Sequence, residues 1–357
     1  MNPLLQLRGL GQRVWLDNLS RTLLRDGTLA RLVSEDGVAG VTSNPAIFYK
    51  AISESPYYRD ELAALRRDAS LTAEQRYERL AIPDIQAACD LLRPAFDASA
   101  GEDGWVSLEV SPFLAHDADA TLTAARRLRS AVARENLLIK VPATAAGLTA
   151  IEALIAEGIS VNVTLMFSLR HVDDVAAAYT RGLKRRVAGG GDPRRVKSVA
   201  SVFLSRIDTL VDKRLEALGG DALALRGKAG VALAKLAYRR YNAILKAEAA
   251  GVSPGARPQF LLWASTGTKN AAYSDVMYVE PLIGPETINT LPDATLAAFR
   301  DHGRASTSLS EDIGTAQRQF AELERLGIAM NAVGDELQVE GVRLFEDAFA
   351  KLLQLTE

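Results

Sequence analysis

The stretch that decides the fold is Leu137-Leu138-Ile139-Lys140-Val141-Pro142-Ala143-Thr144, a short apolar run that carries one lysine and stops at a proline. Runs of this length between turn signals are typical of strands buried on both faces, although a buried helix segment has the same pattern. Burial disfavours a charged ammonium, so a lysine in such a strand indicates a neutral amine that serves as a nucleophile. The alternative is a strand-end lysine that reaches water or meets a carboxylate.

Seven more apolar runs alternate along the chain with segments of helical spacing. The runs cover residues 14–17, 38–42, 105–110, 159–167, 196–203, 260–265 and 286–291. After a lead-in over 1–12, the helical segments cover 19–33, several helices within 46–92, 118–134, 150–157, 169–187, 206–218, 229–250, 295–300, 311–326 and 346–355. Alternating strands and helices favour an α/β fold with a parallel sheet, and eight strands predict a (β/α)8 TIM barrel with extra helices.

Local signals support this division of the chain. Ser20 is a predicted helix N-cap, Thr72 with Gln75 forms a predicted capping box, and Gly158 stands where a C-cap is expected. No linker rich in proline, glycine or serine divides the sequence, so we expect one domain over residues 1–357. An open doubly wound sheet is the alternative, but no G-x-G-x-x-G follows the first run.

The composition is that of an ordinary globular protein. The 357 residues are 48% hydrophobic and 24% charged, and the net charge of −2 gives no reason to expect binding to nucleic acid or to a membrane surface. The single cysteine, Cys89, excludes an intrachain disulfide. No signal-peptide pattern and no apolar segment of about 18 residues are present, so we expect a cytoplasmic protein. The three histidines, at 116, 171 and 302, lack metal-ligand spacing, so we expect no metal.

Polar residues stand at or near the carboxyl ends of seven of the runs, where the active-site loops of a parallel barrel emerge. They are Asp17, Thr42 with Asn44, Glu109, Lys140, Asn162 with Thr164, Ser201 and Ser265. Alternation along a strand also puts certain pairs on one face, which we expect to point into the barrel. These pairs are Ser107 with Glu109, Asn162 with Thr164, and Ser201 with Phe203. A turn or cap role is the alternative for any one of these residues taken singly. Such roles do not explain why polar residues stand at the same end of seven runs.

These residue types point to imine chemistry. A buried lysine without a cofactor motif suits an imine with a carbonyl substrate, so we expect no cofactor. Asp17 and Glu109 are the candidates for the proton transfers that an imine requires. Arg206 and Lys269 follow the sixth and seventh runs and suit a phosphate group on the substrate, with solvated surface charges as the alternative.

Six motifs, taken in chain order, resemble the transaldolase family in its longer bacterial type. They are Val14-Trp15-Leu16-Asp17, Thr42-Ser43-Asn44-Pro45, Ser107-Leu108-Glu109-Val110, Leu138-Ile139-Lys140-Val141-Pro142-Ala143-Thr144, Asn162-Val163-Thr164-Leu165-Met166-Phe167-Ser168 and Ser201-Val202-Phe203-Leu204-Ser205-Arg206. The resemblance implies a (β/α)8 class I aldolase of the pentose phosphate pathway. Such an enzyme moves a dihydroxyacetone unit from sedoheptulose 7-phosphate or fructose 6-phosphate to glyceraldehyde 3-phosphate or erythrose 4-phosphate.

The same resemblance implies roles for single residues. Lys140 would form the Schiff base, and Asp17 would be the acid/base for cleavage of the carbon–carbon bond. Glu109 and Thr164 would hold the water that shuttles protons. Asn44, Asn162 and Ser201 would bind the hydroxyls of the dihydroxyacetone unit, and Arg206 with Ser265 the phosphate. The full substrate-binding set would be Asn44, Thr42, Asn162, Ser201, Phe203, Arg206, Ser265 and Lys269.

The sequence departs from the family pattern in one loop and leaves alternative functions to weigh. Many members have serine, one residue and arginine after the seventh strand, where this chain has Ser265-Thr266-Gly267-Thr268-Lys269-Asn270; a lysine is a point charge, whereas the guanidinium of arginine is a fork of donors.

The nearest alternative function is that of fructose-6-phosphate aldolase, which releases free dihydroxyacetone and uses a tyrosine for water handling. Glu109, Thr164 and Phe203 favour transfer instead. A sugar-phosphate-binding barrel without activity and a structural protein are further alternatives, and the chain is either a monomer or a homodimer.

Overall fold

The structure, a computed structural model, describes residues 2–357 and contains a closed parallel barrel. The strands follow each other around the barrel in chain order, and the last pairs with the first. They are β1 Gln12–Leu16, β2 Val38–Val41, β3 Trp105–Glu109, β4 Leu137–Pro142, β5 Val161–Met166, β6 Ser198–Phe203, β7 Phe260–Ala264 and β8 Thr287–Leu291. The predicted (β/α)8 fold is confirmed, and each strand lies within or beside its predicted run.

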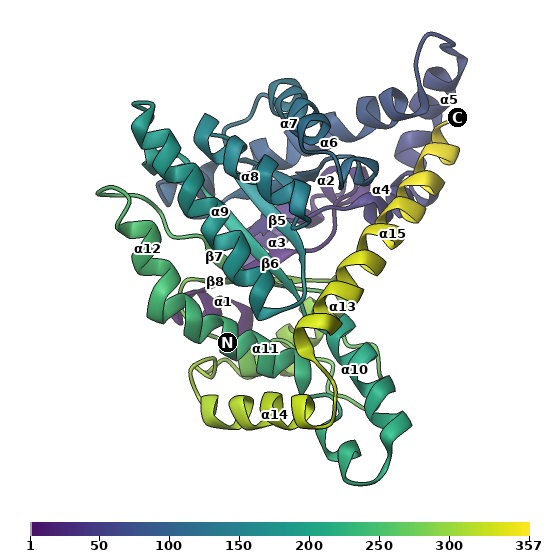
Figure 1. Cartoon of the computed structure of the whole chain (residues 1–357). Helices are drawn as coiled ribbons and strands as arrows, with labels where there is room; N and C mark the ends of the chain where they lie inside the picture. The colour runs from purple at the N-terminus through teal and green to yellow at the C-terminus, as the bar shows by residue number, and fades with distance from the viewer. Residues whose placement is uncertain (1) are drawn as a thin grey trace.

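Helices surround the barrel, and Figure 1 shows α15 as a long helix that runs past α10 to α4 and α5. The helices before β6 are α1 Pro3–Gly9, α2 Arg21–Arg25, α3 Thr28–Glu35, α4 Pro45–Glu54, α5 Arg59–Arg67, α6 Ala73–Ala98, α7 Ala118–Val132, α8 Ala145–Glu157 and α9 Leu169–Ala188. Those after it are α10 Ser205–Leu218, α11 Ala229–Arg240, a π-helical turn Tyr241–Leu245, α12 Lys246–Ala250, α13 Asp293–His302, α14 Ile313–Arg325 and α15 Met330–Thr356. In residues 2–357, no helix is long and apolar enough to cross a membrane.

The predicted helix ends are confirmed. The Ser20 hydroxyl accepts a hydrogen bond from the backbone N–H of Leu23 at 3.2 Å. Thr72 and Gln75 form a complete capping box at the start of α6. Gly158 ends α8 in the left-handed conformation, with φ of +87°, which glycine adopts without a steric penalty.

Some predicted helix bounds were wrong. The segment 19–33 is two helices rather than one, because Gly27 has φ of +71° and separates α2 from α3. The lead-in contains α1, and α8 begins at Ala145 rather than near residue 150. The terminal helix begins at Met330, not near 346. Its first half buries Met330, Val333, Leu337 and Val342 at helical spacing, so a helical signal was present there in the sequence.

One face of α15 is built for close contact with the end of β5. A Cβ atom on Gly334 would lie 2.6 Å from the Cβ of Ser168, and one on Gly341 would lie 3.0 Å from the Cδ2 of Leu165. Between these glycines, the Nε2 of Gln338 donates to the carbonyl oxygens of Ala143 (3.0 Å) and Leu165 (3.1 Å). α15 therefore lies directly on the carboxyl ends of β4 and β5.

Candidate functional site

The site forms at the carboxyl end of the barrel around Lys140, which is 5% exposed on β4. Its Nζ lies 3.3 Å from the carbonyl oxygen of Ser43 and 3.6 Å from Oε2 of Glu109. Strand register accounts for this arrangement, because Lys140 is the direct partner of Glu109 on β3 and of Asn162 on β5. Lys140 is thus buried and lies next to a carboxylate.

A chain of hydrogen bonds crosses the barrel interior below Lys140. The Nδ2 of Asn162 donates to Oγ of Ser107 at 3.0 Å, and Oγ of Ser201 donates to Oδ1 of Asn162 at 2.7 Å. The three residues come from β3, β5 and β6, and the bond from Asn162 to Ser107 passes across β4, so the contacts confirm that they point inward, as strand alternation predicts. The chain fixes the orientation of the Asn162 carboxamide.

Asp17 follows β1 and is held by threonines of the neighbouring strands. The Thr42 hydroxyl donates to Oδ1 of Asp17 at 2.6 Å and lies 2.7 Å from the hydroxyl of Thr290 at the end of β8. Burial raises the pKa of Asp17, while the charge of Lys140 and the Thr42 hydrogen bond oppose that rise. A carboxyl group in this setting exchanges protons more readily near neutral pH than an exposed one does.

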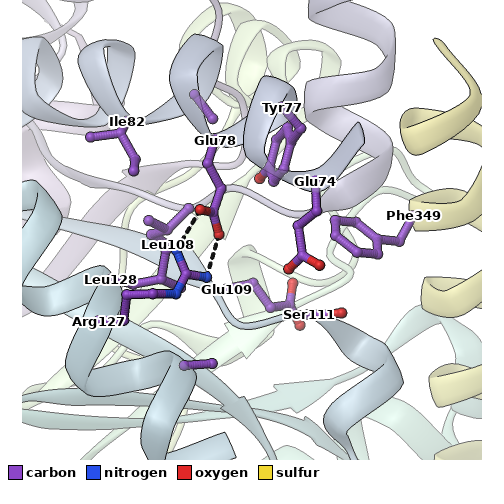
Figure 2. A pocket seen from close by; sticks show the side chains of 12 residues that line it. Glu74, Tyr77, Glu78, Ile82, Leu108, Glu109, Ser111, Arg127, Leu128 and Phe349 are labelled. Atoms are coloured by element: carbon purple, nitrogen blue, oxygen red, sulfur yellow. Dashed lines mark hydrogen bonds and ion pairs between the residues drawn. The ribbon is translucent and has the colours of Figure 1, made fainter. Parts of the chain in front are cut away.

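Burial also raises the pKa of Glu109, to about 7, although Lys140 acts in the opposite direction. On the side of α6 and α7, Glu109 borders a cavity of about 10 Å³, roughly the room that one water needs. Figure 2 shows Glu74 and Ser111 at this cavity, with the Arg127–Glu78 ion pair beside it. Glu109 therefore combines a pKa suited to proton transfer with space for water.

Three buried polar atoms of the predicted site have no hydrogen-bond partner: Glu109 Oε2, Thr164 Oγ1 and Arg206 Nη1. An unpaired buried polar group costs about 1–3 kcal/mol, so such groups are uncommon without a purpose. All three follow or end barrel strands at the same rim. Together they are suited to a polar ligand that supplies the missing partners.

Arg206 lies between two aromatic rings. Its Cζ is 5.5 Å from the ring centroid of Phe203 and 5.8 Å from that of Phe345 on α15. Burial lowers the pKa of its guanidinium, whereas Glu340 and Glu109 raise it. Nearby, the hydroxyl of Ser265 lies 2.7 Å from that of Ser205, the residue before Arg206. Ser265 is thus in contact with the residue that precedes Arg206 in the chain.

Lys269 and Asn44 lie less centrally than the other predicted residues. Lys269 is exposed and borders a cavity of about 320 Å³ that also contains Asp208 and Asp212, although its charge still lowers the pKa of Asp17. The Oδ1 of Asn44 accepts the backbone N–H of Ile47 at 3.0 Å and caps α4. The cap role therefore applies to the oxygen of this side chain.

The widest hollow next to the site opens beside Asp17. It has a volume of about 540 Å³, lies between the loop after β1 and α4, and is lined by Lys50, Glu54 and Asp293 among others. Its other wall is formed by α2, at Thr22 and Leu23. The hollow therefore gives a small molecule room beside Asp17.

The sequence-based reasoning missed several residues at the site. Thr290 could have been found, because it stands at the end of the eighth run as the other polar residues do. Ser43 acts through its backbone carbonyl, which leaves no signal in the residue type. Phe345 and Gln338 lie on the part of α15 that was not recognised as helix; their spacing from Gly334 and Gly341 is the signal that could have revealed the shared face.

The geometry supports amine chemistry on a carbonyl compound. A buried amine, two carboxyl groups with raised pKa values and an unpaired hydroxyl surround one point, as imine formation and proton transfer require. Among residues 2–357, no group of three or more His, Cys, Asp or Glu side chains is arranged to hold a metal ion.

Comparisons with known proteins give consistent results. The profile of the family described as Transaldolase/Fructose-6-phosphate aldolase matches residues 14–356. A protein named transaldolase from Thiobacillus denitrificans is 56% identical over 356 residues, which are 99% of both chains. Proteins of the same name from Neisseria gonorrhoeae and Mycobacterium marinum are each 48% identical, over 99% and 100% of this chain and 99% and 97% of theirs.

Proposed function

Because this chain belongs to the transaldolase/fructose-6-phosphate aldolase family, we propose that Lys140 is the lysine through which it transfers a dihydroxyacetone unit. The activity is that of a transaldolase, acting on phosphorylated sugars in the pentose phosphate pathway through a Schiff base. Sedoheptulose 7-phosphate and glyceraldehyde 3-phosphate give erythrose 4-phosphate and fructose 6-phosphate. What we propose is the role of each residue in this reaction.

Lys140 attacks the C2 carbonyl of the donor ketose, water leaves, and an imine forms. Asp17 then takes the proton of the C4 hydroxyl as the bond between C3 and C4 breaks, which releases an aldehyde and leaves a three-carbon enamine on Lys140. The support for these roles is the burial of Lys140 and the raised pKa of Asp17, which stays hydrogen-bonded to Thr42. In the second half of the reaction, C3 of the enamine forms a bond to the carbonyl carbon of the acceptor aldehyde. Asp17 then returns its proton to the carbonyl oxygen.

Glu109 and Thr164 handle the water of imine formation and hydrolysis. A carboxyl group with a pKa of about 7 gives and takes protons with little penalty near neutral pH. The unpaired Thr164 hydroxyl is the second partner for that water. Imine formation and product release then use the same water position.

The other predicted residues bind the substrate. Asn162 and Ser201 offer hydroxyl contacts from their fixed hydrogen-bond chain, and Asn44 does so through its amide nitrogen, because its oxygen caps α4. Thr42 acts through Asp17, and Phe203 packs on the guanidinium of Arg206. Arg206, with Ser265 beside it, binds the phosphate through its unpaired Nη1. Lys269 adds positive charge at longer range.

The observation that carries these assignments is the set of unpaired buried atoms on Glu109, Thr164 and Arg206 around one buried amine. Borohydride with fructose 6-phosphate should fix a three-carbon unit on Lys140. Mass spectrometry that finds the label on another lysine would refute the assignment. The rate of fructose 6-phosphate cleavage with and without erythrose 4-phosphate separates transfer from simple release of dihydroxyacetone.

We also propose one domain across residues 1–357 and a cytoplasmic location. Both ends of the chain join the same barrel, since β8 pairs with β1 and the Thr356 hydroxyl donates to the carbonyl of Ala73 at 2.9 Å. Free, buried Cys89 suits a reducing compartment. A single cooperative unfolding transition supports one domain, whereas two separated transitions contradict it; cell fractionation tests the location.

A further inference from the structure

One aromatic ring on the last helix lies close to both Lys140 and Arg206. The ring centroid of Phe345 is 5.7 Å from Nζ of Lys140 and 5.8 Å from Cζ of Arg206. Phe345 is itself 8% exposed, so its ring is part of the buried site rather than of the surface. No step proposed above uses this residue.

The ring is held in place from both sides along α15. Toward the start of the helix, Gln338 is bonded to the ends of β4 and β5, and Gly334 and Gly341 permit close contact there. Toward its end, the Phe349 ring lies 5.7 Å from that of Tyr77 on α6 in an edge contact. A segment fixed at two points covers the site as a constant wall, not as a mobile flap.

The wall and the opening lie on different sides of Lys140. α15 packs on the ends of β4 and β5, whereas the hollow of about 540 Å³ lies beside Asp17 at the end of β1. We therefore expect the aldehyde to enter and leave through this hollow, while the buried ring of Phe345 covers Lys140 on the side of α15.

We propose that Phe345 determines how the dihydroxyacetone adduct is resolved, by keeping bulk water from the enamine so that transfer outruns release. The inference rests on the proposed imine at Lys140. It assigns Phe345 a positioning and specificity role, not a step in proton transfer.

The two outcomes differ in what reaches the enamine. In transfer, its C3 forms a bond to the carbonyl carbon of the acceptor, and the carbonyl oxygen takes the proton from Asp17. In release, C3 takes the proton from Asp17 instead, which leaves an iminium. Water then adds to the iminium carbon and loses a proton to the Asp17 carboxylate. The carbon–nitrogen bond then breaks, leaving free dihydroxyacetone and the amine of Lys140. A second water supplied from bulk solvent favours only the latter route.

The test compares Phe345→Ala with Val339→Ala, a control on the same helix at a position that is 71% exposed. Each protein is assayed for dihydroxyacetone release from fructose 6-phosphate alone and for transfer to erythrose 4-phosphate. The ratio of release to transfer should rise at least about threefold in Phe345→Ala, because removal of the ring lets bulk water reach the enamine. Val339→Ala should keep the wild-type ratio.

Borohydride trapping separates the proposed Schiff base on Lys140 from the proposed role of Phe345. No adduct on Lys140 in the wild type would defeat the proposed function, whatever the ratio. A normal adduct with an unchanged ratio in folded Phe345→Ala overturns the role of Phe345, as does an equal rise in Val339→Ala. If thermal melting shows that Phe345→Ala does not fold, Phe345→Leu decides: a smaller rise supports the proposal, and the wild-type ratio overturns it.

Discussion

Nζ of Lys140 lies 3.6 Å from Oε2 of Glu109, and each of the two side chains exposes only 6% of its surface. Water screens this pair only weakly, so the charge of Lys140 acts on Glu109 and lowers its pKa. Burial nevertheless raises the pKa of Glu109 to about 7. A carboxyl group that is partly protonated at neutral pH is thereby kept next to the reacting amine.

This pKa predicts a pH dependence of the reaction. A plot of log kcat/KM against pH should bend near pH 7, where Glu109 of the free enzyme changes protonation. Glu109→Gln should lower kcat and remove that bend, since an amide does not titrate. Initial rates between about pH 5 and pH 9 provide the measurement. A bend that persists in the variant would assign it to another group.

The same shift predicts a pH dependence of stability. The pKa of Glu109 rises on folding from its ordinary value of 4.5 to about 7, so between these values the folded protein binds more protons than the unfolded chain. The free energy of unfolding must then fall as pH rises through this window. Urea denaturation at both ends of the window should show a smaller fall for Glu109→Gln than for the wild type. Equal falls would mean that Glu109 is not the cause.

Asp17→Asn should lower kcat by roughly two to four decades, the usual contribution of a positioned acid/base. Its hydrogen bond to Thr42 survives in altered form, so folding should be little affected. Asp301→Asn, at a side chain that is 85% exposed, is the matched control and should turn over normally. Near-normal turnover of Asp17→Asn would remove this residue from the mechanism.

Arg206→Met should raise the KM for phosphorylated sugars about tenfold or more, because it removes charge-assisted hydrogen bonds from a buried site. Lys269→Met should have a smaller effect, since that lysine is exposed. Unphosphorylated fructose serves as the internal control and should respond weakly to both changes. A larger effect at Lys269 than at Arg206 would reverse the assignment of the phosphate ligand.

Gly40→Ala should destabilise the barrel by about 1–3 kcal/mol, the usual cost of overpacking a core. Its Cβ would lie 2.5 Å from Cε2 of buried Trp15 on the neighbouring strand. Gly314→Ala on α14 is the control: only Arg318 lies within 4 Å of its Cβ, so it should be neutral or stabilising. Chemical denaturation of both variants gives the comparison.

The sequence was sufficient for the barrel and for much of the site, for a physical reason. Parallel strands place their carboxyl ends at one rim, and alternation along a strand selects the inward residues. Those two rules alone bring Glu109, Lys140 and Asn162 into adjacent register. Their chemistry then follows from residue type.

The rest depends on contacts that no local pattern encodes. Phe345 reaches Lys140 across 205 positions of sequence, so no local pattern places its ring beside the lysine. An asparagine at the position of Asn44 is expected both for a substrate ligand and for a helix cap, so the sequence does not separate the two roles. In the structure, its side-chain oxygen caps α4. The position of Lys269 depends on the loop after β7, where Ser265 has φ of +54°.

Pairing of β8 with β1 also has a consequence for the order in which the chain acquires activity. Asp17 is produced early in synthesis, but its backbone N–H bonds to the carbonyl of Leu291 at 2.8 Å, and its partner Thr42 contacts Thr290. A nascent chain that ends before β8 holds the nucleophile on β4 without the acid/base in place. Such long-range closure slows folding, and it delays a reactive lysine from meeting metabolites until nearly the whole protein has been made.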